Sequence, residues 1–232
     1  MSEAEGGPGR RDLSFTTQAR GAVSALLVAP PEPIALYVVA HGAGAGMSHP
    51  FMERISQALA TLGIATFRYN FPYMEARRGS PDRAPVLLET VRAAVGAAAE
   101  ALPGVPLLAG GKSMGGRMTS QAQAESPLPG VQSLVFLGFP LHPPGRPATE
   151  RADHLAQVQT PMLFLQGTRD DFAELELIRG VTSSLGQRAT LHLIDDADHG
   201  FHVPKRTGRT DAEVIEELAE QVSQWGRKTM RT

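Results

Sequence analysis

The strongest constraint on this chain comes from the segment 107–117 (LLAGGKSMGGR), which places Ser113 between two glycines directly after an apolar run. Glycines two residues before and two residues after a serine leave room for neighbouring backbone in a sharp strand-to-helix turn. The helix after such a turn points its N–H groups and its positive dipole end at the serine hydroxyl. The segment therefore predicts a strand, a tight turn that exposes Ser113 as a nucleophile, and a helix.

A serine nucleophile needs a base and a group that orients the base, and candidates for both follow in the sequence. The apolar run 161–167 ends shortly before Asp170, and the run 189–194 leads into His199. Serine, aspartate and histidine in this chain order are typical of α/β hydrolases. Because each residue follows a buried strand pattern, all three are expected at the carboxyl edge of a parallel sheet. The sequence thus predicts a catalytic triad of Ser113, His199 and Asp170.

Two positions of this triad leave alternatives. Asp171 adjoins Asp170, but the spacing glycine–any–any–aspartate from Gly167 favours Asp170. His199 precedes a glycine in the loop between the last strand and the last helix, and His202 is the alternative to it. Three further aspartates follow the predicted strand 190–194, which precedes His199 rather than Asp170. They are predicted to be turn residues: Asp195, Asp196 and Asp198.

A glycine-rich loop is predicted to supply part of the oxyanion hole. An apolar strand pattern runs directly into HGAGAG, residues 41–46. In the hydrolase arrangement one donor is the N–H after the nucleophile, here Met114, and the other lies in the loop after the third strand. We assign the second donor to Ala43, with Gly42 and Gly44 as alternatives.

Six motifs occur together: HGAGAG, FRYNFPY, GGKSMGGR, FLGFPLHPPGRP, GTRDD and DADHGF. Over residues 34–225 the sequence resembles a compact group of α/β hydrolases related to the dienelactone hydrolases, here with a GKSMG serine elbow. Dienelactone hydrolases usually carry a cysteine nucleophile, whereas this chain has no cysteine, so their substrate is not carried over. Some relatives of this group act in protein complexes. A catalytically weak or inactive binding or scaffold protein is therefore the alternative function.

The resemblance and the pattern of apolar runs predict an α/β-hydrolase fold, a mainly parallel, doubly wound sheet flanked by helices. Residues 1–10 are expected to form a disordered tail, and residues 11–232 a single domain. An antiparallel strand pair is expected over 12–29. Further strands are predicted at 34–40, 64–68, 105–109, 131–137, 162–166 and 190–194, and helices at 51–62, 84–101, 114–124, 172–185 and 211–226.

The connection 138–160 is short and rich in proline, so no large cap domain fits there. The site is therefore expected to be open, with the loop 141–147 as one wall. Two histidines are expected to order their own backbone rather than contact substrate: His41 in the glycine-rich loop, and His49 at a helix start.

Five residues near the predicted site are candidates for substrate contacts. Gly42 lies in the oxyanion loop, and Arg68 and Asn70 follow the fourth predicted strand on the same side of the sheet. Lys112 and His142 carry polar groups that suit an acidic or polar substrate.

Composition argues against several other classes of protein. The chain has 22 basic and 24 acidic side chains and a formal net charge of −2, so neither nucleic acid nor an anionic membrane is an expected partner. Without cysteine or a long apolar N-terminal run, no disulfide, signal peptide or spanning helix is expected, and the cytoplasm is the expected location. A P-loop is rejected because Pro106 stands at its first glycine, and a dinucleotide fingerprint because Met47 stands at its third.

The expected activity is hydrolysis of a small carboxylic ester through an acyl-enzyme intermediate on Ser113. No cofactor and no metal ion are expected. Thioester hydrolysis, amide hydrolysis and acyl transfer are the neighbouring alternatives, since the motifs leave the acyl group undefined.

Overall fold

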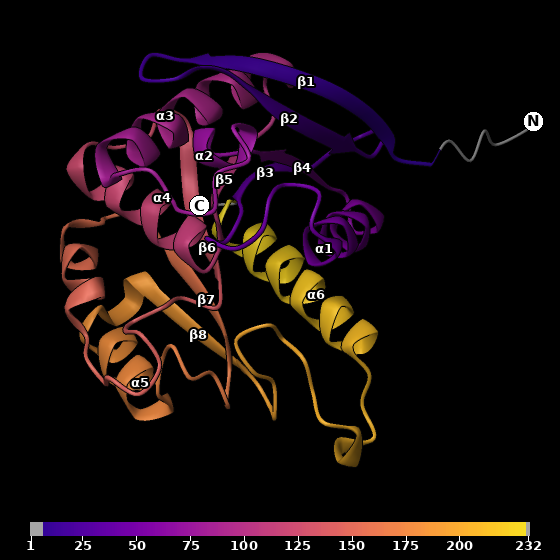
Figure 1. Ribbon diagram of the computed structural model, residues 1–232. Helices are drawn as coiled ribbons and strands as arrows, with labels where there is room; N and C mark the ends of the chain where they lie inside the picture. Colours follow the sequence, from indigo (N-terminus) through magenta and orange to yellow (C-terminus); the bar gives the residue numbers. More distant parts are fainter. Residues whose placement is uncertain (1–6, 231–232) are drawn as a thin grey trace, which may run out of the picture.

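The computed structural model describes residues 7–230, which contain one eight-stranded sheet with helices on both faces (Figure 1). The strand order is β1-β2-β4-β3-β5-β6-β7-β8, in which β2 runs antiparallel to both of its neighbours, β1 and β4, and all other neighbouring strands are parallel. This arrangement confirms the predicted α/β-hydrolase fold. The strands are β1 (Gly9–Thr17), β2 (Gly21–Ala29), β3 (Ala35–Ala40), β4 (Ile64–Tyr69), β5 (Leu107–Lys112), β6 (Val131–Leu137), β7 (Met162–Gly167) and β8 (Ala189–Ile194).

Helices cover the two faces of the sheet in separate groups. On one face lie α1 (Pro50–Thr61) and α6 (Asp211–Thr229), and on the other lie α3 (Ala84–Ala101), α4 (Met114–Glu125) and α5 (Leu175–Ser184). The short elements are α2 (Pro72–Glu75) and three 3₁₀ helices, η1 (Glu150–Gln157), η2 (Gly186–Arg188) and η3 (Lys205–Thr207). Within the described part of the chain, no helix has the length and apolar character needed to cross a membrane.

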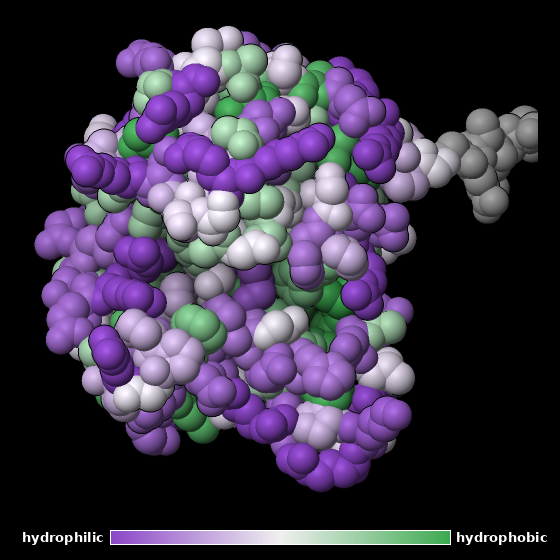
Figure 2. Space-filling view, in the orientation of Figure 1, coloured by the Kyte–Doolittle hydropathy of each residue, from purple (hydrophilic) through white to green (hydrophobic). Residues whose placement is uncertain are grey.

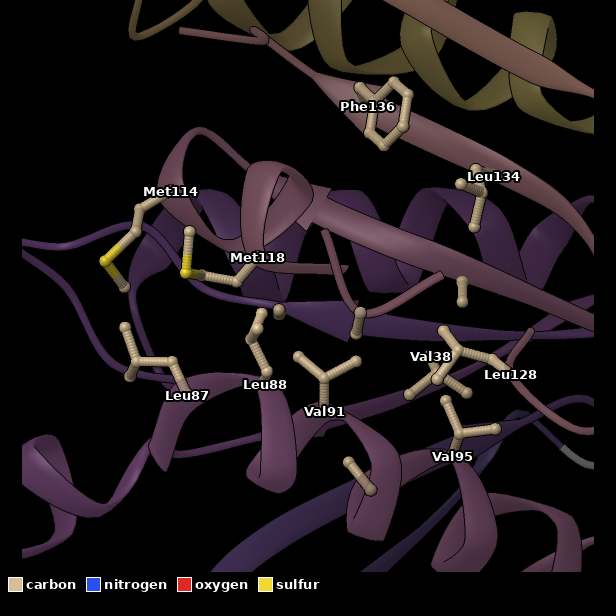
Figure 3. Packing of buried hydrophobic residues seen from close by; sticks show 14 of the residues in the cluster. Val38, Leu87, Leu88, Val91, Val95, Met114, Met118, Leu128, Leu134 and Phe136 are labelled. Atoms are coloured by element: carbon tan, nitrogen blue, oxygen red, sulfur yellow. The ribbon is translucent and has the colours of Figure 1, made fainter. Parts of the chain in front are cut away.

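Alternate side chains of the central strands fill two separate cores. In β3, Leu36 and Val38 belong to the core under α3 and α4, whereas Tyr37 and Val39 belong to the core under α1 and α6. A strand covered on both faces is apolar at every position, which is why the run of β3 was readable in the sequence. Figure 3 shows the first core, where side chains of α3 and α4 meet those of β3 and β6.

The N-terminal hairpin starts earlier than the sequence indicated. Strand β1 begins at Gly9, and Gly9 and Arg10 pair with Ala29 and Val28 of β2, so these two residues belong to the sheet rather than to the expected tail. Neither residue adds to an apolar alternation, because Gly9 has no side chain and the side chain of Arg10 is exposed. Residues 1–6 of that expected tail lie outside the described residues.

Two other boundaries moved for identifiable reasons. Strand β5 runs to Lys112 rather than ending at Ala109, because its glycine pair continues the pairing with β3 and β6. Helix α5 begins at Leu175 rather than at Phe172. The Phe172 N–H donates to an Asp170 carboxylate oxygen at 2.8 Å, so this segment is a loop.

No large cap covers the carboxyl edge of the sheet. The connection between β6 and β7 holds only η1, which packs against α4 and buries Ala152 and Leu155 in the first core. This connection therefore completes the core instead of forming a lid.

His41, which follows β3, is buried and fully hydrogen-bonded to backbone. Its Nδ1 lies 2.7 Å from the Gly42 carbonyl oxygen, and its Nε2 lies 3.0 Å from the Phe71 amide nitrogen. An Nδ1–H donor together with an Nε2 acceptor satisfies both contacts only in the neutral ring. Burial lowers the pKa of His41 to about 4. The prediction that His41 orders its own loop is thus consistent with its contacts.

The aromatic centre of the first core predicts a large loss of stability on truncation. The Phe136 ring lies 4.8 Å from the Phe164 ring and 5.2 Å from the Phe139 ring, measured between centroids. We expect Phe136→Ala to lower the free energy of unfolding by about 3–5 kcal/mol through lost contacts and a cavity. Urea unfolding tests this value, with Leu102→Ala at the half-buried end of α3 as the control. A loss for Phe136→Ala no larger than the control would contradict the packing described.

The neutral state of His41 predicts acid sensitivity. Its pKa of about 4 in the folded protein lies below the ordinary histidine value, so the unfolded chain binds more protons between those two values. The contribution of a neutral His41 to stability is therefore complete above about pH 6.5 and is lost as the pH falls toward about 4. At pH 5 this effect lowers the free energy of unfolding by about 2 kcal/mol relative to its value at neutral pH. Urea unfolding of wild type and His41→Gln at several pH values checks this. A pH dependence as steep in the variant as in wild type would show that His41 is not responsible.

Candidate active site

The serine turn is strained in the way that the glycine spacing requires. Ser113 connects β5 to α4 with φ of 51° and ψ of −119°, in a region that non-glycine residues rarely adopt. A Cβ atom on Gly111 would lie 2.1 Å from the Ala40 carbonyl oxygen, and one on Gly115 would lie 2.4 Å from the same oxygen. Both glycines of the motif are therefore required by the close approach of the turn to the end of β3.

The structure brings the three residues of the predicted triad together. Ser113 Oγ lies 2.8 Å from His199 Nε2, and His199 Nδ1 lies 2.7 Å from Asp170 Oδ2. With a proton on Nδ1 donated to Asp170, Nε2 is left to accept the hydrogen bond of the serine hydroxyl. Asp171 and His202 are exposed and take no part in this line of hydrogen bonds.

Asp170 is held rigidly by groups around it. Its side chain is 1% exposed, against 21% for His199. The Gln166 amide donates to Oδ2 at 2.5 Å, and the Phe172 N–H donates to Oδ1. The Phe172 ring then stacks on the His199 ring with centroids 4.2 Å apart. The motifs did not identify Gln166 or Phe172, although Gln166 is the polar residue in an otherwise apolar strand and that signal was available.

Opposing influences act on the pKa of the His199 imidazole. Burial lowers this pKa, the hydrogen bond to Asp170 raises it, and the positive charge of Lys112 lowers it. The net shift is downward from the ordinary histidine value. A neutral imidazole is consequently the dominant form at pH 7, and a neutral imidazole can accept a proton from Ser113.

Two backbone segments flank Ser113 where the oxyanion donors were predicted. Met114 is the first residue of α4, so its N–H has no carbonyl of its own helix to bind. Ala43 lines the cavity in front of Ser113, and the Tyr73 hydroxyl donates to its carbonyl oxygen at 2.8 Å. The Ala43 carbonyl is thereby turned toward Tyr73 and held there.

Arg68 and Asn70, which were predicted to contact substrate, brace this loop instead of lining the cavity. Arg68 is buried and donates to the Met47 carbonyl at 2.9 Å. Asn70 accepts from the Met47 N–H at 3.0 Å and donates to Glu75 at the same distance. Asn70 directly follows β4 as predicted, whereas Arg68 lies within that strand. Both side chains hydrogen-bond to the backbone of Met47, which gives these polar groups a partner away from the cavity.

His142 also differs from its prediction. It is buried, its Nδ1 lies 2.9 Å from the Pro143 carbonyl, and its Nε2 accepts from the Glu174 N–H at 3.3 Å. The loop 141–147 is not a wall of the cavity either. It supports the wall from behind, because the N–H groups of Leu141 and His142 both donate to the Phe172 carbonyl.

The cavity beside Ser113 has a volume of about 400 Å³. Figure 2 shows a largely hydrophilic face with apolar side chains gathered in a hollow near α1 and α6. The lining combines the predicted Gly42, Lys112, Ser113 and His199 with side chains that the motifs had not indicated, chiefly Phe51, Met52 and Phe172. His49 also lines the cavity, and its Nδ1 accepts from the Phe51 N–H at 3.2 Å as the predicted N-cap of α1.

Across residues 7–230, no three histidine, cysteine or carboxylate side chains group closely enough to hold a metal ion. The side chain hydrogen-bonded to Ser113 is the His199 imidazole, which is in turn hydrogen-bonded to the Asp170 carboxylate.

Comparison with known proteins agrees with this geometry. A model of the alpha/beta hydrolase domain matches residues 33–227. Among solved structures, the chain is similar to a dienelactone hydrolase from Anabaena variabilis, at 20% identity and a TM-score of 0.76 over 97% of this chain and 99% of that chain. The chain is also similar to an alpha-beta serine hydrolase homologue from Coxiella burnetii, at 20% identity and a TM-score of 0.75 over 91% of this chain and 97% of that chain. A third similar structure is a serine hydrolase without a lid from Xanthomonas campestris, at 23% identity and a TM-score of 0.72 over 93% of this chain and 94% of that chain.

The structural likenesses lie below the identity at which an activity carries over, so they show the fold. The domain match is independent of them and spans the strained serine turn, the glycine-rich loop and the loops that carry Asp170 and His199. The chain therefore belongs to the alpha/beta hydrolase domain family.

Proposed function

We propose that this protein is a serine hydrolase that cleaves small carboxylic esters through an acyl-enzyme on Ser113. The observation that supports this most directly is the unbroken line of hydrogen bonds from Ser113 through His199 to Asp170 at the edge of the cavity. An isolated hydroxyl is a poor nucleophile at neutral pH, and a neutral imidazole at hydrogen-bond distance removes that limitation.

In the acylation half, Ser113 Oγ attacks the ester carbonyl carbon while His199 Nε2 takes the hydroxyl proton. The carbonyl oxygen becomes an oxyanion, which the N–H groups of Met114 and Ala43 stabilise by about 3 kcal/mol each. Asp170 holds the ring in the required tautomer and stabilises the imidazolium. The intermediate collapses when His199 returns the proton to the departing alcohol, which leaves the acyl group on Ser113.

In the deacylation half, a water molecule takes the place of the alcohol. His199 removes its proton as the water oxygen attacks the acyl carbon, and the same two N–H groups stabilise the second oxyanion. Collapse returns the proton to Ser113 Oγ and releases a carboxylic acid. One water molecule is consumed, and Ser113 and His199 return to their starting protonation states.

Cavity dimensions support a small substrate. A volume of about 400 Å³ falls at the lower end of the range for small-molecule sites. Phe51, Met52 and Phe172 give apolar walls, which suit a short aliphatic or single-ring acyl group. Because no large cap covers the site, little surface is present to bury a long lipid chain.

Fluorophosphonate labelling tests the proposed nucleophile without a choice of substrate. We expect one phosphonyl adduct on wild-type protein, located at Ser113 by peptide mass spectrometry, and no adduct on Ser113→Ala. Hydrolysis of short p-nitrophenyl esters should be lost in the same variant. Folded wild-type protein that takes up no probe, or takes it up at another serine, would reject the proposal and favour the binding-protein alternative.

The adjacent aspartates provide a matched pair of variants. We expect Asp170→Asn to reduce the labelling rate about 10³- to 10⁴-fold, because an amide no longer favours the tautomer that His199 needs. The same change at the exposed Asp171 should alter the rate by less than about threefold. Fluorophosphonate labelling of both variants, quenched at successive times, measures these rates. Similar reductions of the labelling rate in the two variants would contradict the role given to Asp170.

A further inference from the structure

Lys112 is a lysine beside Ser113 that the proposed mechanism does not use. It is the last residue of β5, and its side chain lines the cavity. Its ammonium group donates to the His199 carbonyl oxygen at 2.5 Å. The same Nζ lies 5.2 Å from the centre of the Phe201 ring and 6.0 Å from that of Phe51. The ammonium is therefore enclosed by aromatic rings and by the loop that carries His199.

Gly138 leaves the space through which this ammonium reaches the Asp170–His199 pair. A Cβ atom at this position would lie 2.9 Å from Lys112 Nζ, 3.5 Å from His199 Nδ1 and 3.6 Å from Asp170 Oδ2. The φ of Gly138 is 71°, which also favours glycine. Lys112, His199 and Asp170 consequently surround one small volume that a glycine keeps free of side-chain atoms.

A positive charge in this place is costly. Burial lowers the pKa of Lys112 to about 8, although the negative charges of Asp170 and Asp198 oppose the shift. The ammonium thus stays predominantly charged at pH 7. An apolar side chain of similar length would fill the space between the two phenylalanine rings without this desolvation. Packing alone does not account for a lysine here.

We propose that Lys112 is a positioning residue that fixes His199 through its backbone carbonyl and keeps the imidazole unprotonated. The proposal rests on the proposed function, in which His199 is the general base. Three charged groups act on the ring: Lys112 from β5, Asp170 from the loop after β7, and Asp198 from the loop that carries His199 itself. Lys112 is the one cation among them, and it opposes the two carboxylates.

The sign of the effect follows from these charges. An ammonium beside the ring disfavours imidazolium, so its removal raises the pKa of His199. A protonated His199 cannot take the proton of Ser113. The loss of labelling on acidification should therefore begin at a higher pH once the ammonium is gone, and the loosened carbonyl should lower the rate at every pH.

The pKa of His199 can be measured directly by NMR titration of protein with ¹³C-labelled histidine, with the signal assigned by its loss in His199→Gln. We expect Lys112→Met to raise this pKa by about one unit. The acidic limb of the fluorophosphonate labelling rate should move by the same amount. Lys228→Met, the same change at an exposed position on α6, should leave both values unchanged.

The absence of cysteine from the chain allows a sharper test. Lys112→Cys introduces a unique thiol, which aminoethyl methanethiosulfonate converts to a side chain with a terminal ammonium. Propyl methanethiosulfonate gives a neutral side chain of matched length. We expect the aminoethyl adduct to restore the wild-type pKa of His199 and the propyl adduct to keep the raised one. This comparison holds even where Lys112→Met folds poorly, because the two adducts differ in the terminal group alone.

Two results would overturn the assignment of Lys112. One is a pKa of His199 that is equal in wild type and in folded Lys112→Met, and the other is equal pKa values in the two adducts. Failure of the proposed hydrolase activity gives a different pattern, since wild-type Ser113 would then remain unlabelled while the pKa of His199 still followed the charge at position 112.

Discussion

The carbonyl oxygen of Ala40 is the contact on which the site depends. Both glycines of the serine motif approach it so closely that no side chain fits, and Ala40 pairs with Gly111 across the sheet. The glycine-rich loop begins at the next residue. The turn that carries Ser113 and the start of the glycine-rich loop therefore meet at one point at the end of β3, and the serine turn cannot move without disturbing the pairing of β3 with β5.

From that point outward, buried polar side chains determine the course of the glycine-rich loop. His41, Tyr73 and Arg68 contact the carbonyls of Gly42, Ala43 and Met47. Glycine costs more backbone entropy to order than any other residue, so a loop of this composition needs such contacts to hold one conformation. The same arrangement makes the loop dependent on a neutral His41, which links the shape of the site to the acid stability of the fold.

The sequence was most informative where function depends on local backbone geometry. The turn at Ser113 was readable because two glycines mark it, and the loops with Asp170 and His199 were readable because each follows an apolar run in the sequence. Side-chain direction was not readable in this way. Arg68, Asn70 and His142 stand beside the site in the chain, but each turns to a backbone partner that only the folded loops provide. Phe172 lines the cavity from a loop, because its N–H donates to the Asp170 carboxylate and α5 begins only at Leu175. No pattern in the sequence indicates this hydrogen bond.

The short connection between β6 and β7 has a consequence for the timing of the proposed reaction. Without a large cap, no cap domain has to close before chemistry or open after it, so an alcohol or acid product has a short path to solvent once its bond is broken. The same exposure leaves bulk solvent in contact with the bound ester, and transition-state charge cannot be stabilised by sealing the site from water. Catalytic power must then come from groups already in place before substrate arrives, which accords with a loop and an imidazole that are each held through their backbone carbonyls.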